Sequence, residues 1–265
     1  MNPGSLKKYG PWAVIAGASE GIGREIAERL AISGIHLVLL DNKRDELDKT
    51  SRYLNETCSV DVLPLCIDLT EARAYETIKH ATQDKEVGFY AHIACSAPLG
   101  AFMDIDETAH DSAINLNVVL ASKLSRLYAP GMSQRKGGGI VFCGSMASLS
   151  GFPYNAQYSA GKAYLKNLGE ALWYELREYN IDVHTAVISE VMTPSFKRSG
   201  SKARGNGYTL TPSQCADEIF ASLGKYPSRT TGFLNRIDAF FLAHVIPQKM
   251  TLKILANTIK SRFMK

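Results

Sequence analysis

Short apolar runs alternate with amphipathic stretches from Trp12 to Ser189. Each run has about the length of a buried strand, and each stretch that follows has the apolar spacing of a helix that rests one face on a core. Near-continuous apolar strands separated by helices are typical of a parallel sheet that is buried on both faces. We therefore predict one doubly wound α/β domain over residues 1–235, with residues 236–265 as an amphipathic helical extension of it. The apolar runs are WAVIAG, IHLVLLD, DVLPLCID, FYAHIAC, GGIVFCGS and IDVHTAVIS.

The bulk composition excludes several classes of protein. Of the 265 residues, 45% are hydrophobic and 21% are charged, which is typical of a globular protein rather than a disordered or fibrous one. The formal net charge is only +4, and most basic residues are interleaved with acids, so we expect no nucleic-acid partner. The five cysteines are odd in number and form no CxxC pair, so we expect neither a disulfide framework nor a metal site. Without a signal-peptide pattern or a long apolar stretch, the expected compartment is the cytoplasm.

Three glycines lie between the first apolar run and the first helical stretch. In AVIAGASEGIGREIAERL they are Gly17, Gly21 and Gly23, and we expect Ser19 and Ile22 between them to contact the cofactor as well. Glycines allow a tight turn and let backbone N–H groups approach a pyrophosphate at the positive end of a helix. The pattern predicts the dinucleotide-binding turn of a Rossmann fold, although an ordinary strand-to-helix turn could contain the same residues.

Acids at the ends of the second and third runs bear on which dinucleotide binds. Asp41 can accept hydrogen bonds from both hydroxyls of the adenosine ribose and would repel a 2′-phosphate, which favours NAD. Lys43 and Arg44 follow it and could instead bind that phosphate, so NADP is the alternative. Asp68 is placed to meet the adenine amine, with Leu69 beside the ring, but Asp68 could equally cap the helix that follows.

Tyr158 and Lys162 lie one helical turn apart in QYSAGKAYL, so a helix places them on one face. Ser145 ends the run GGIVFCGS, at the sheet edge where a cofactor crevice is expected. Hydride transfer to a carbonyl also requires a proton at its oxygen, and a phenol with a pKa near ~10 is a poor base at neutral pH. We expect Lys162 to lower that pKa and to bind the nicotinamide ribose, Ser145 to hold the substrate oxygen, and Tyr158 to transfer the proton. The alternative is that Tyr158 packs on a helix surface and Lys162 is solvated.

This chain resembles the short-chain dehydrogenases/reductases over nearly its whole length. The resemblance rests on the order and spacing of the glycine turn, the two acids, the serine and the Tyr-x-x-x-Lys pair. The resemblance implies a nicotinamide-dependent oxidoreductase that forms a homodimer or homotetramer. It adds Asn117, in INLNVVLAS, as a fourth catalytic residue that kinks its helix and holds a water for proton relay to Lys162. It also places Ile188 and Thr193 on the nicotinamide side, with Thr193 meeting the carboxamide.

Three segments depart from the pattern of that family. Ala16 stands where the glycine motif usually begins with Thr, so a side-chain hydrogen bond to the fourth strand is lost. The usual Asn-Asn-Ala-Gly appears as Ala-Cys-Ser-Ala at residues 94–97, and the usual Pro-Gly appears as Ile188 and Ser189. These changes leave open a second function, a dinucleotide-binding regulatory protein with weak catalysis. An epimerase or dehydratase that retains its NAD is a third, which the length of the chain disfavours.

The C-terminal segment is basic and amphipathic, since no acid follows Asp238 and apolar residues recur at helical spacing opposite the bases. It can lie on an acidic membrane as a peripheral contact, or it can cover a substrate pocket or a subunit contact.

Together, the opening residues and this C-terminal segment look like those of the branch of 17β-hydroxysteroid and very-long-chain 3-oxoacyl reductases, without that branch's N-terminal membrane helix. This implies a hydrophobic carbonyl or alcohol substrate, a fatty acyl chain or a steroid, and we expect the polar stretch Ser195 to Thr209 to be a mobile loop at its entrance. The bases are Lys249, Lys253, Lys260, Arg262 and Lys265, and the apolar residues are Leu252, Leu255, Ile259 and Phe263.

Overall fold

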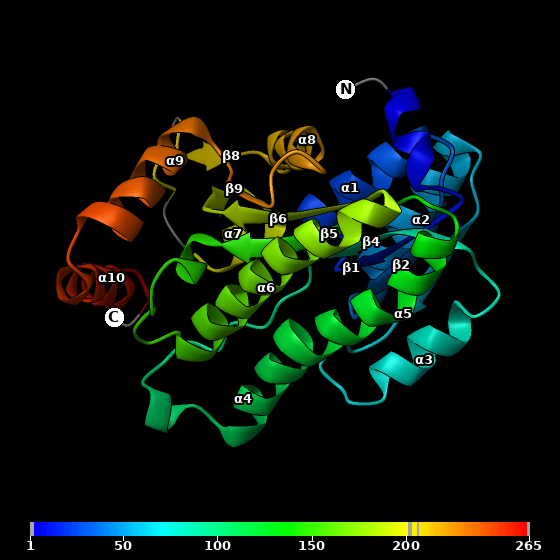
Figure 1. Ribbon diagram of the computed structural model, residues 1–265. Helices are drawn as coiled ribbons and strands as arrows, with labels where there is room; N and C mark the ends of the chain where they lie inside the picture. Colours follow the sequence, from blue (N-terminus) through cyan, green and yellow to red (C-terminus); the bar gives the residue numbers. More distant parts are fainter. Residues whose placement is uncertain (1–2, 201–202, 206, 264–265) are drawn as a thin grey trace.

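A seven-stranded parallel sheet lies between two layers of helices in the computed structural model, which describes residues 3–200, 203–205 and 207–263 (Figure 1). The strand order is β3-β2-β1-β4-β5-β6-β9. The chain builds outward from β1 in one direction and from β4 in the other, and ligands of such sheets bind at the carboxyl ends of the strands beside that reversal. The predicted doubly wound Rossmann fold is therefore confirmed. The strands are β1 Trp12–Ala16, β2 His36–Asp41, β3 Val62–Cys66, β4 Val87–His92, β5 Gly138–Ser145, β6 Ile181–Ile188 and β9 Ser228–Thr230.

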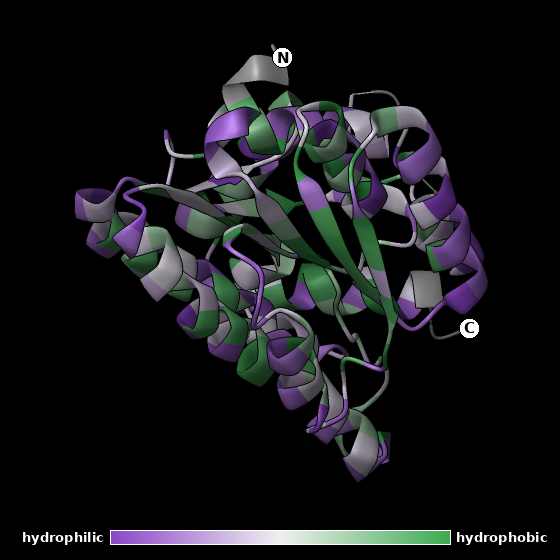
Figure 2. Ribbon diagram, turned by 90° about the vertical axis from the view of Figure 1, so that its right-hand side faces the viewer, coloured by the Kyte–Doolittle hydropathy of each residue, from purple (hydrophilic) through white to green (hydrophobic). Residues whose placement is uncertain are grey.

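Helices cover both faces of the sheet, and the strands between them are mostly hydrophobic (Figure 2). Alternate residues of a strand point to opposite faces. Ile15 of β1 therefore packs in one core with Ile26, while its neighbour Val14 packs in the other with Leu124 and Leu165. One face carries α1 Gly21–Ile32, α2 Arg44–Cys58 and α8 Pro212–Ser222, and the other carries α3 Ala74–Ala81, α5 Ala121–Gln134 and α6 Ala156–Glu175.

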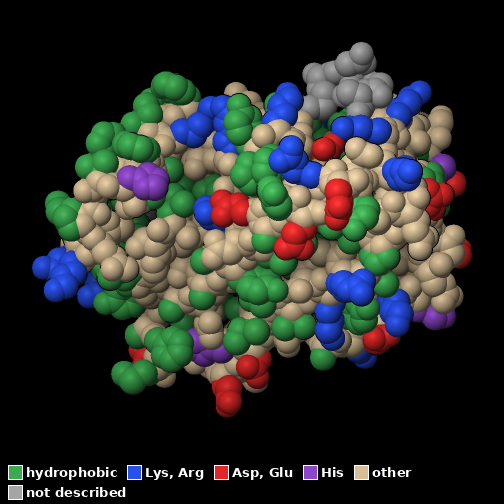
Figure 3. All heavy atoms as spheres, in the orientation of Figure 1, with side chains coloured by type: hydrophobic (Ala, Val, Ile, Leu, Met, Phe, Trp, Pro, Cys, Tyr) green, Lys and Arg blue, Asp and Glu red, His purple; other side chains and the backbone are tan. Residues whose placement is uncertain are grey.

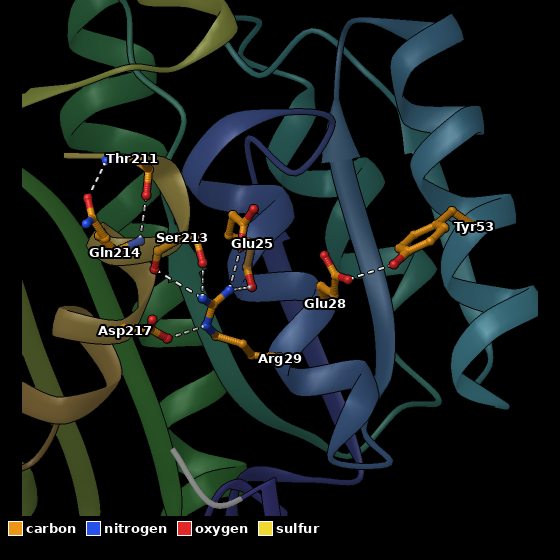
Figure 4. A network of polar contacts seen from close by, with 8 residues as sticks. All are labelled: Glu25, Glu28, Arg29, Tyr53, Thr211, Ser213, Gln214 and Asp217. Atoms are coloured by element: carbon orange, nitrogen blue, oxygen red, sulfur yellow. Dashed lines mark hydrogen bonds and ion pairs between the residues drawn. The ribbon is translucent and has the colours of Figure 1, made fainter.

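Polar contacts fix α1 between its two neighbouring helices (Figure 4). Nε of Arg29 donates to Asp217 of α8 at 2.9 Å, and Nη2 donates to the hydroxyl of Ser213 at 2.8 Å. On the other side, the hydroxyl of Tyr53 in α2 donates to Glu28 at 2.8 Å. Because the glycine turn leads directly into α1, these contacts also hold that turn in place.

One expected helix boundary differs from the structure, and the expected domain boundary is not tested. The third helix begins at Ala74 rather than near Glu71, because Asp68 accepts hydrogen bonds from the backbone N and the hydroxyl of Thr70 and holds a turn ahead of the helix. α9 (Phe233–Phe240) runs across the expected boundary between residues 235 and 236, so the two-part division of the chain stays a prediction.

The expected loop from Ser195 to Thr209 is wrong at both of its ends. Helix α7 (Pro194–Arg198) begins after Thr193, whose hydroxyl accepts the backbone N–H of Phe196 at 3.0 Å, and proline suits a first helical position. At the other end, β8 (Thr209–Leu210) pairs with β7 (Glu190–Val191). Residues 201, 202 and 206 of the expected loop lie outside the described residues.

The C-terminal segment is helical. α9 continues as the π-helix η6 (Phe241–Val245), and α10 (Gln248–Phe263) follows. Among the described residues, no helix combines the length and the apolar character needed to span a bilayer. The remaining elements are α4 Glu107–Ile114, the π-helix η3 Asn115–Leu120 and the 3-10 turns η1 Pro3–Tyr9, η2 Phe102–Asp104, η4 Met146–Ser148 and η5 Leu176–Tyr179.

Candidate active site

The glycine turn joins β1 to α1 and leaves no space for side chains at its tightest points. Gly17 and Gly21 have φ values of +86° and +59°, which favour glycine. A Cβ on Gly23 would lie 1.9 Å from the carbonyl oxygen of Gly17, and one on Gly17 would lie 2.6 Å from the backbone N of Ala94. The first turn of α1 therefore rests directly on the strand. Its positive end forms a cradle that fits a pyrophosphate.

A cavity of about 550 Å³ reaches from this turn to Tyr158 along the carboxyl ends of the strands. Most of the residues that we expect to bind the cofactor lie on its surface. Ser19, Gly23 and Lys162 do not, because they support the wall from behind. The expected residues on the surface are Gly17, Gly21, Ile22, Asp41, Asp68, Leu69, Tyr158, Ile188 and Thr193.

Asp41 ends β2 and is held by backbone donors. Its carboxylate accepts the N–H of Ser19 at 3.1 Å and the N–H of Lys43 at 3.2 Å. The ammonium of Lys43 is itself paired with Glu20, so it is not free to bind a phosphate without leaving that acid.

Glu20 is a site residue that the sequence reasoning missed. Besides Lys43 it binds Arg198 of α7, whose Nη1 lies 2.9 Å from its carboxylate. The hydrogen bond from Arg198 contributes most to holding the pKa of Glu20 below its usual value, against the effect of burial. This ion cluster links the glycine turn, the end of β2 and α7 at the mouth of the cavity. An acid inside the glycine turn was its one signal in the sequence.

Asp68 does not cap the helix that follows, since the N-cap residue of α3 is Arg73, and its contact with the adenine amine stays a prediction. One carboxylate oxygen holds Thr70, which makes it a turn residue, and the side chain also lies on the surface of the cavity. Leu69 is buried beside it, with 6% of its surface exposed.

Tyr158 and Lys162 come from the first half of α6 and meet beneath the cavity. Lys162 is fully buried, and its Nζ donates to the carbonyl of Cys143 in β5 at 2.6 Å. The same Nζ lies 5.5 Å from the centre of the Tyr158 ring. Lys162 is therefore not solvated, and the structure brings both residues together with Ser145, which forms a hydrogen bond with the Tyr158 side chain.

The charges of this group follow from its burial. Burial raises the pKa of Tyr158, and although Lys162 and the hydrogen bond with Ser145 act against this, the pKa reaches about 12. Burial also opposes the charge on Lys162, but Coulomb attraction to the ionised forms of Cys143, Cys95 and Tyr158 raises its pKa above the usual lysine value. At neutral pH the site thus holds a protonated phenol beside an ammonium.

Asn117 lies in the π-helix η3 and anchors the altered segment 94–97. Its fully buried amide donates to the carbonyl of Ser96 at 2.7 Å and accepts the N–H of Ser96 at 3.0 Å. A Cβ on Gly161 would lie 2.9 Å from that of Asn117, so α6 packs tightly against the π-helix. The water-holding role implied by the resemblance is not tested by these contacts and stays a prediction.

Two of the departures from the family pattern are accommodated by the backbone. The carbonyl of Ala16 accepts the N–H groups of Ile93 and Ala94, at 2.9 and 2.8 Å, so backbone hydrogen bonds join β1 to the end of β4 without a threonine hydroxyl. Ile188 pairs with Ser145 across the sheet and is buried beside Tyr158. Thr193 caps α7, and its methyl carbon would lie 3.0 Å from a Cβ on Gly21, so α7 is seated on the glycine turn.

A second cavity of about 670 Å³ lies on the other side of Tyr158. Ser145, Tyr158 and Ile188 form its inner end, and η6 and α10 form much of the remaining wall. Its charged residues are the buried Glu190 and an ion pair between Arg204 and Asp238 at 2.6 Å. The sequence predicted no site role for any of these three, since no local pattern linked them to Tyr158. The apolar residues that the C-terminal segment contributes to the wall are Phe241, Leu242, Ile246, Ile254, Leu255 and Ile259.

The C-terminal residues named from the sequence divide between two places. Leu255 and Ile259 line the second cavity, so the C-terminal helices do cover a pocket. Leu252 instead lies 3.6 Å from the Cβ position of Gly151. The side chains of Arg262 and Phe263, and Lys265, lie outside the described residues.

Comparisons with known proteins agree with this geometry. Residues 11–204 match the short chain dehydrogenase family. The 7beta-hydroxysteroid dehydrogenase of Collinsella aerofaciens is 31% identical over 87% of this chain and 89% of its own length. The inactive hydroxysteroid dehydrogenase-like protein 1 of Rattus norvegicus is 31% identical over 93% of this chain and 75% of its own length.

Solved structures resemble the whole architecture. The structure of a 7beta-hydroxysteroid dehydrogenase superposes with a TM-score of 0.89 at 28% identity and covers 96% of this chain and 99% of that one. A short-chain dehydrogenase from Sphingobium yanoikuyae in complex with NADPH gives a TM-score of 0.75 at 25% identity, covering 87% and 91%. This chain therefore belongs to the short-chain dehydrogenase family, as an oxidoreductase that depends on a nicotinamide dinucleotide.

Proposed function

We propose that this protein interconverts a hydrophobic ketone and its secondary alcohol, with Tyr158 as the proton-transferring residue. The observation that carries the proposal is the place of Tyr158, which borders both the cavity at the glycine turn and the second, largely apolar cavity. A nicotinamide dinucleotide bound over the glycine turn supplies or takes up the hydride. Substrate in the second cavity would then meet it at Tyr158 and Ser145.

The chain's own residues account for the proton. In reduction, the phenol of Tyr158 donates its proton to the carbonyl oxygen, and Ser145 hydrogen-bonds that oxygen. The phenolate that remains is stabilised by the ammonium of Lys162, 5.5 Å from the ring centre. Lys162 is held in position by the carbonyl of Cys143. Asn117 supports the opposite side of the site through Ser96.

The direct test is the absorbance change at 340 nm with NADH or NADPH and a panel of hydrophobic ketones. We expect Tyr158→Phe to lose activity by about 10² to 10⁴-fold, the usual contribution of a positioned acid, while still binding the dinucleotide. Tyr164→Phe, on the same helix and partly exposed, is the matched control and should keep its activity. Undiminished turnover by Tyr158→Phe would refute the proposed role.

For the cofactor we propose NAD over NADP. Asp41 is held at the end of β2 on the cavity surface, where it would meet the adenosine ribose, and Lys43 is occupied by Glu20. A 2′-phosphate would face the carboxylate of Asp41 and would have to compete with Glu20 for Lys43. The relative crystallised with NADPH keeps NADP as the alternative.

Titration of NADH and NADPH into wild type, Asp41→Asn and Glu20→Gln tests this choice. We expect wild type to prefer NADH, Asp41→Asn to lose that preference, and Glu20→Gln to gain NADPH affinity because Lys43 and Arg198 are released. Tighter binding of NADPH by wild type would overturn the assignment.

For the substrate we propose a steroid-like or fatty acyl ketone or alcohol. The support is the apolar wall of the second cavity and the 7beta-hydroxysteroid dehydrogenases among the relatives. Turnover of steroid ketones, long-chain 3-oxoacyl esters and small polar ketones separates these classes, and a preference for the small polar ketones would exclude a hydrophobic substrate.

A dinucleotide-binding regulatory protein with weak catalysis is the second candidate, and the relative named as inactive favours it. Dinucleotide binding without absorbance change across the substrate panel would support this candidate.

We further propose a homodimer or homotetramer in the cytoplasm, with a peripheral membrane contact of the C-terminal segment. Sedimentation velocity measures the oligomeric state, and vesicle binding measures the membrane contact.

A further inference from the structure

The helix pair α9 and η6 presents hydrophobic side chains to solvent. Phe233, Ile237, Phe240, Phe241 and Val245 recur at helical spacing, and each is between 42% and 69% exposed. We refer to these five residues as the C-terminal apolar face. Figure 3 shows hydrophobic side chains gathered over α9, with Lys and Arg side chains beside them over α10. Continuous apolar surface of this kind on a folded protein marks a contact surface.

The charge around this face has one sign. Lys249 and Lys253 are exposed on α10 beside Met250 and Ile254, and no acid follows Asp238 in the sequence. Asp238 on α9 and Glu218 on α8 are each paired with an arginine, with Arg204 at 2.6 Å and with Arg236 at 3.3 Å. Among the described residues, Lys249 and Lys253 form no ion pair, so the face adjoins lysines whose charge is not compensated.

The second cavity opens onto the same face. Phe241 and Ile254 both line that cavity and are 47% and 39% exposed. A ligand that entered between these two side chains would reach Tyr158 along a largely apolar wall.

These observations distinguish between two occupants. A second copy seated on the face by two-fold symmetry would bring the lysines of both copies together and would close the mouth of the cavity. An anionic bilayer accepts the apolar side chains, attracts the lysines and leaves the cavity open to molecules dissolved in lipid. We propose that the C-terminal apolar face docks on an anionic lipid bilayer and that hydrophobic substrate enters the second cavity from the lipid. The entry route rests on the proposed function, whereas the docking does not.

The docking is tested with the full chain by flotation with phosphatidylcholine vesicles that contain or lack phosphatidylglycerol. We expect binding to the anionic vesicles only. Replacing both Phe233 and Phe240 by Gln should weaken it by about tenfold or more. Replacing both Lys249 and Lys253 by Gln should weaken it by roughly fivefold per lysine. Met103→Gln, which removes a side chain that is 93% exposed outside this face, is the matched control and should bind as wild type does.

Equal flotation of wild type and the Phe233→Gln/Phe240→Gln variant would overturn the docking. If the same variant lost a dimer in sedimentation velocity while vesicle binding was unchanged, the face would be a contact between copies instead. The entry route is measured as turnover of a ketone dissolved in vesicles against that of a water-soluble ketone. We expect the phenylalanine variant to be slower only with the first, and equal loss with both would overturn the route. Failure of wild type with both ketones would refute the proposed function and leave the docking result standing.

Discussion

Tyr158 stands between two cavities whose walls are built in different ways. On the dinucleotide side, contacts of backbone atoms set the wall, as where a Cβ on Gly23 would meet the carbonyl of Gly17 and where Asn117 binds both backbone groups of Ser96. On the substrate side, η6 and α10 contribute individual apolar side chains such as Leu255. A backbone-built wall tolerates few replacements, whereas a wall of side chains can change its shape residue by residue. The chemistry is thus fixed on one side of Tyr158, and specificity is adjustable on the other.

The largest effect should come from the buried ammonium on the dinucleotide side. Lys162→Met keeps most of the length of the side chain but removes the charge beside Tyr158, so we expect kcat to fall by about 10² to 10⁴-fold. Lys166→Met, one turn further along α6, removes an ammonium that pairs with Glu170 at 2.8 Å and should change kcat little. Steady-state kinetics compare the two, and equal losses would mean that helix perturbation rather than charge is responsible.

The pH dependence should differ between the two directions of the reaction. Burial raises the pKa of Tyr158 to about 12, so the phenol stays protonated through the neutral range. Alcohol oxidation needs the phenolate, whose fraction rises about tenfold per pH unit below the pKa, whereas ketone reduction needs the phenol. We expect kcat/KM for oxidation to climb steadily from neutral to alkaline pH while the value for reduction stays flat. A plateau in oxidation near neutral pH would show that Tyr158 ionises there instead.

Removal of the Asn117 amide should affect stability and dinucleotide binding together. Asn117→Ala leaves the two backbone groups of Ser96 without their partner, at a cost of about 1 to 3 kcal/mol in the free energy of unfolding. Asn115→Ala in the same π-helix should stay within about 0.5 kcal/mol. Urea denaturation with and without dinucleotide measures both effects. If Asn117→Ala kept both its stability and its affinity for the dinucleotide, the contrast between the two cavity walls would not hold.

The smallest effect should come from the substrate side. Leu255→Ala enlarges the second cavity, and we expect a change of about tenfold or less in kcat/KM that depends on the size of the substrate. Leu252→Ala, on the same helix but outside that cavity, is the control. A loss that is the same for small and large substrates would indicate that α10 positions Tyr158 and does not merely shape the pocket.

The contrast between the walls also explains what could be predicted from the sequence. The turn at Gly17 to Gly23 and the pairing of Tyr158 with Lys162 depend on neighbours in the chain, so local spacing indicated them. The link between Glu20 and Arg198, and the seating of α10 over the second cavity, join segments far apart in the sequence. No local pattern specifies which cavity a helix face will meet. Asp68 was ambiguous for a physical reason, since it holds a turn and lines the cavity at once.

The π-helix at Asn115–Leu120 has a consequence for how this chain can vary. A π-bulge contains one residue more than the α-helix needs, and each residue turns a helix by about 100°, so α4 and α5 are set out of phase by that insertion. Deleting a single residue there would rotate Asn117 away from Ser96 while leaving Leu124 in the core. The segment should therefore accept exchanges of residue type more readily than changes of length. Among relatives, insertions and deletions should be found on either side of it but not within it.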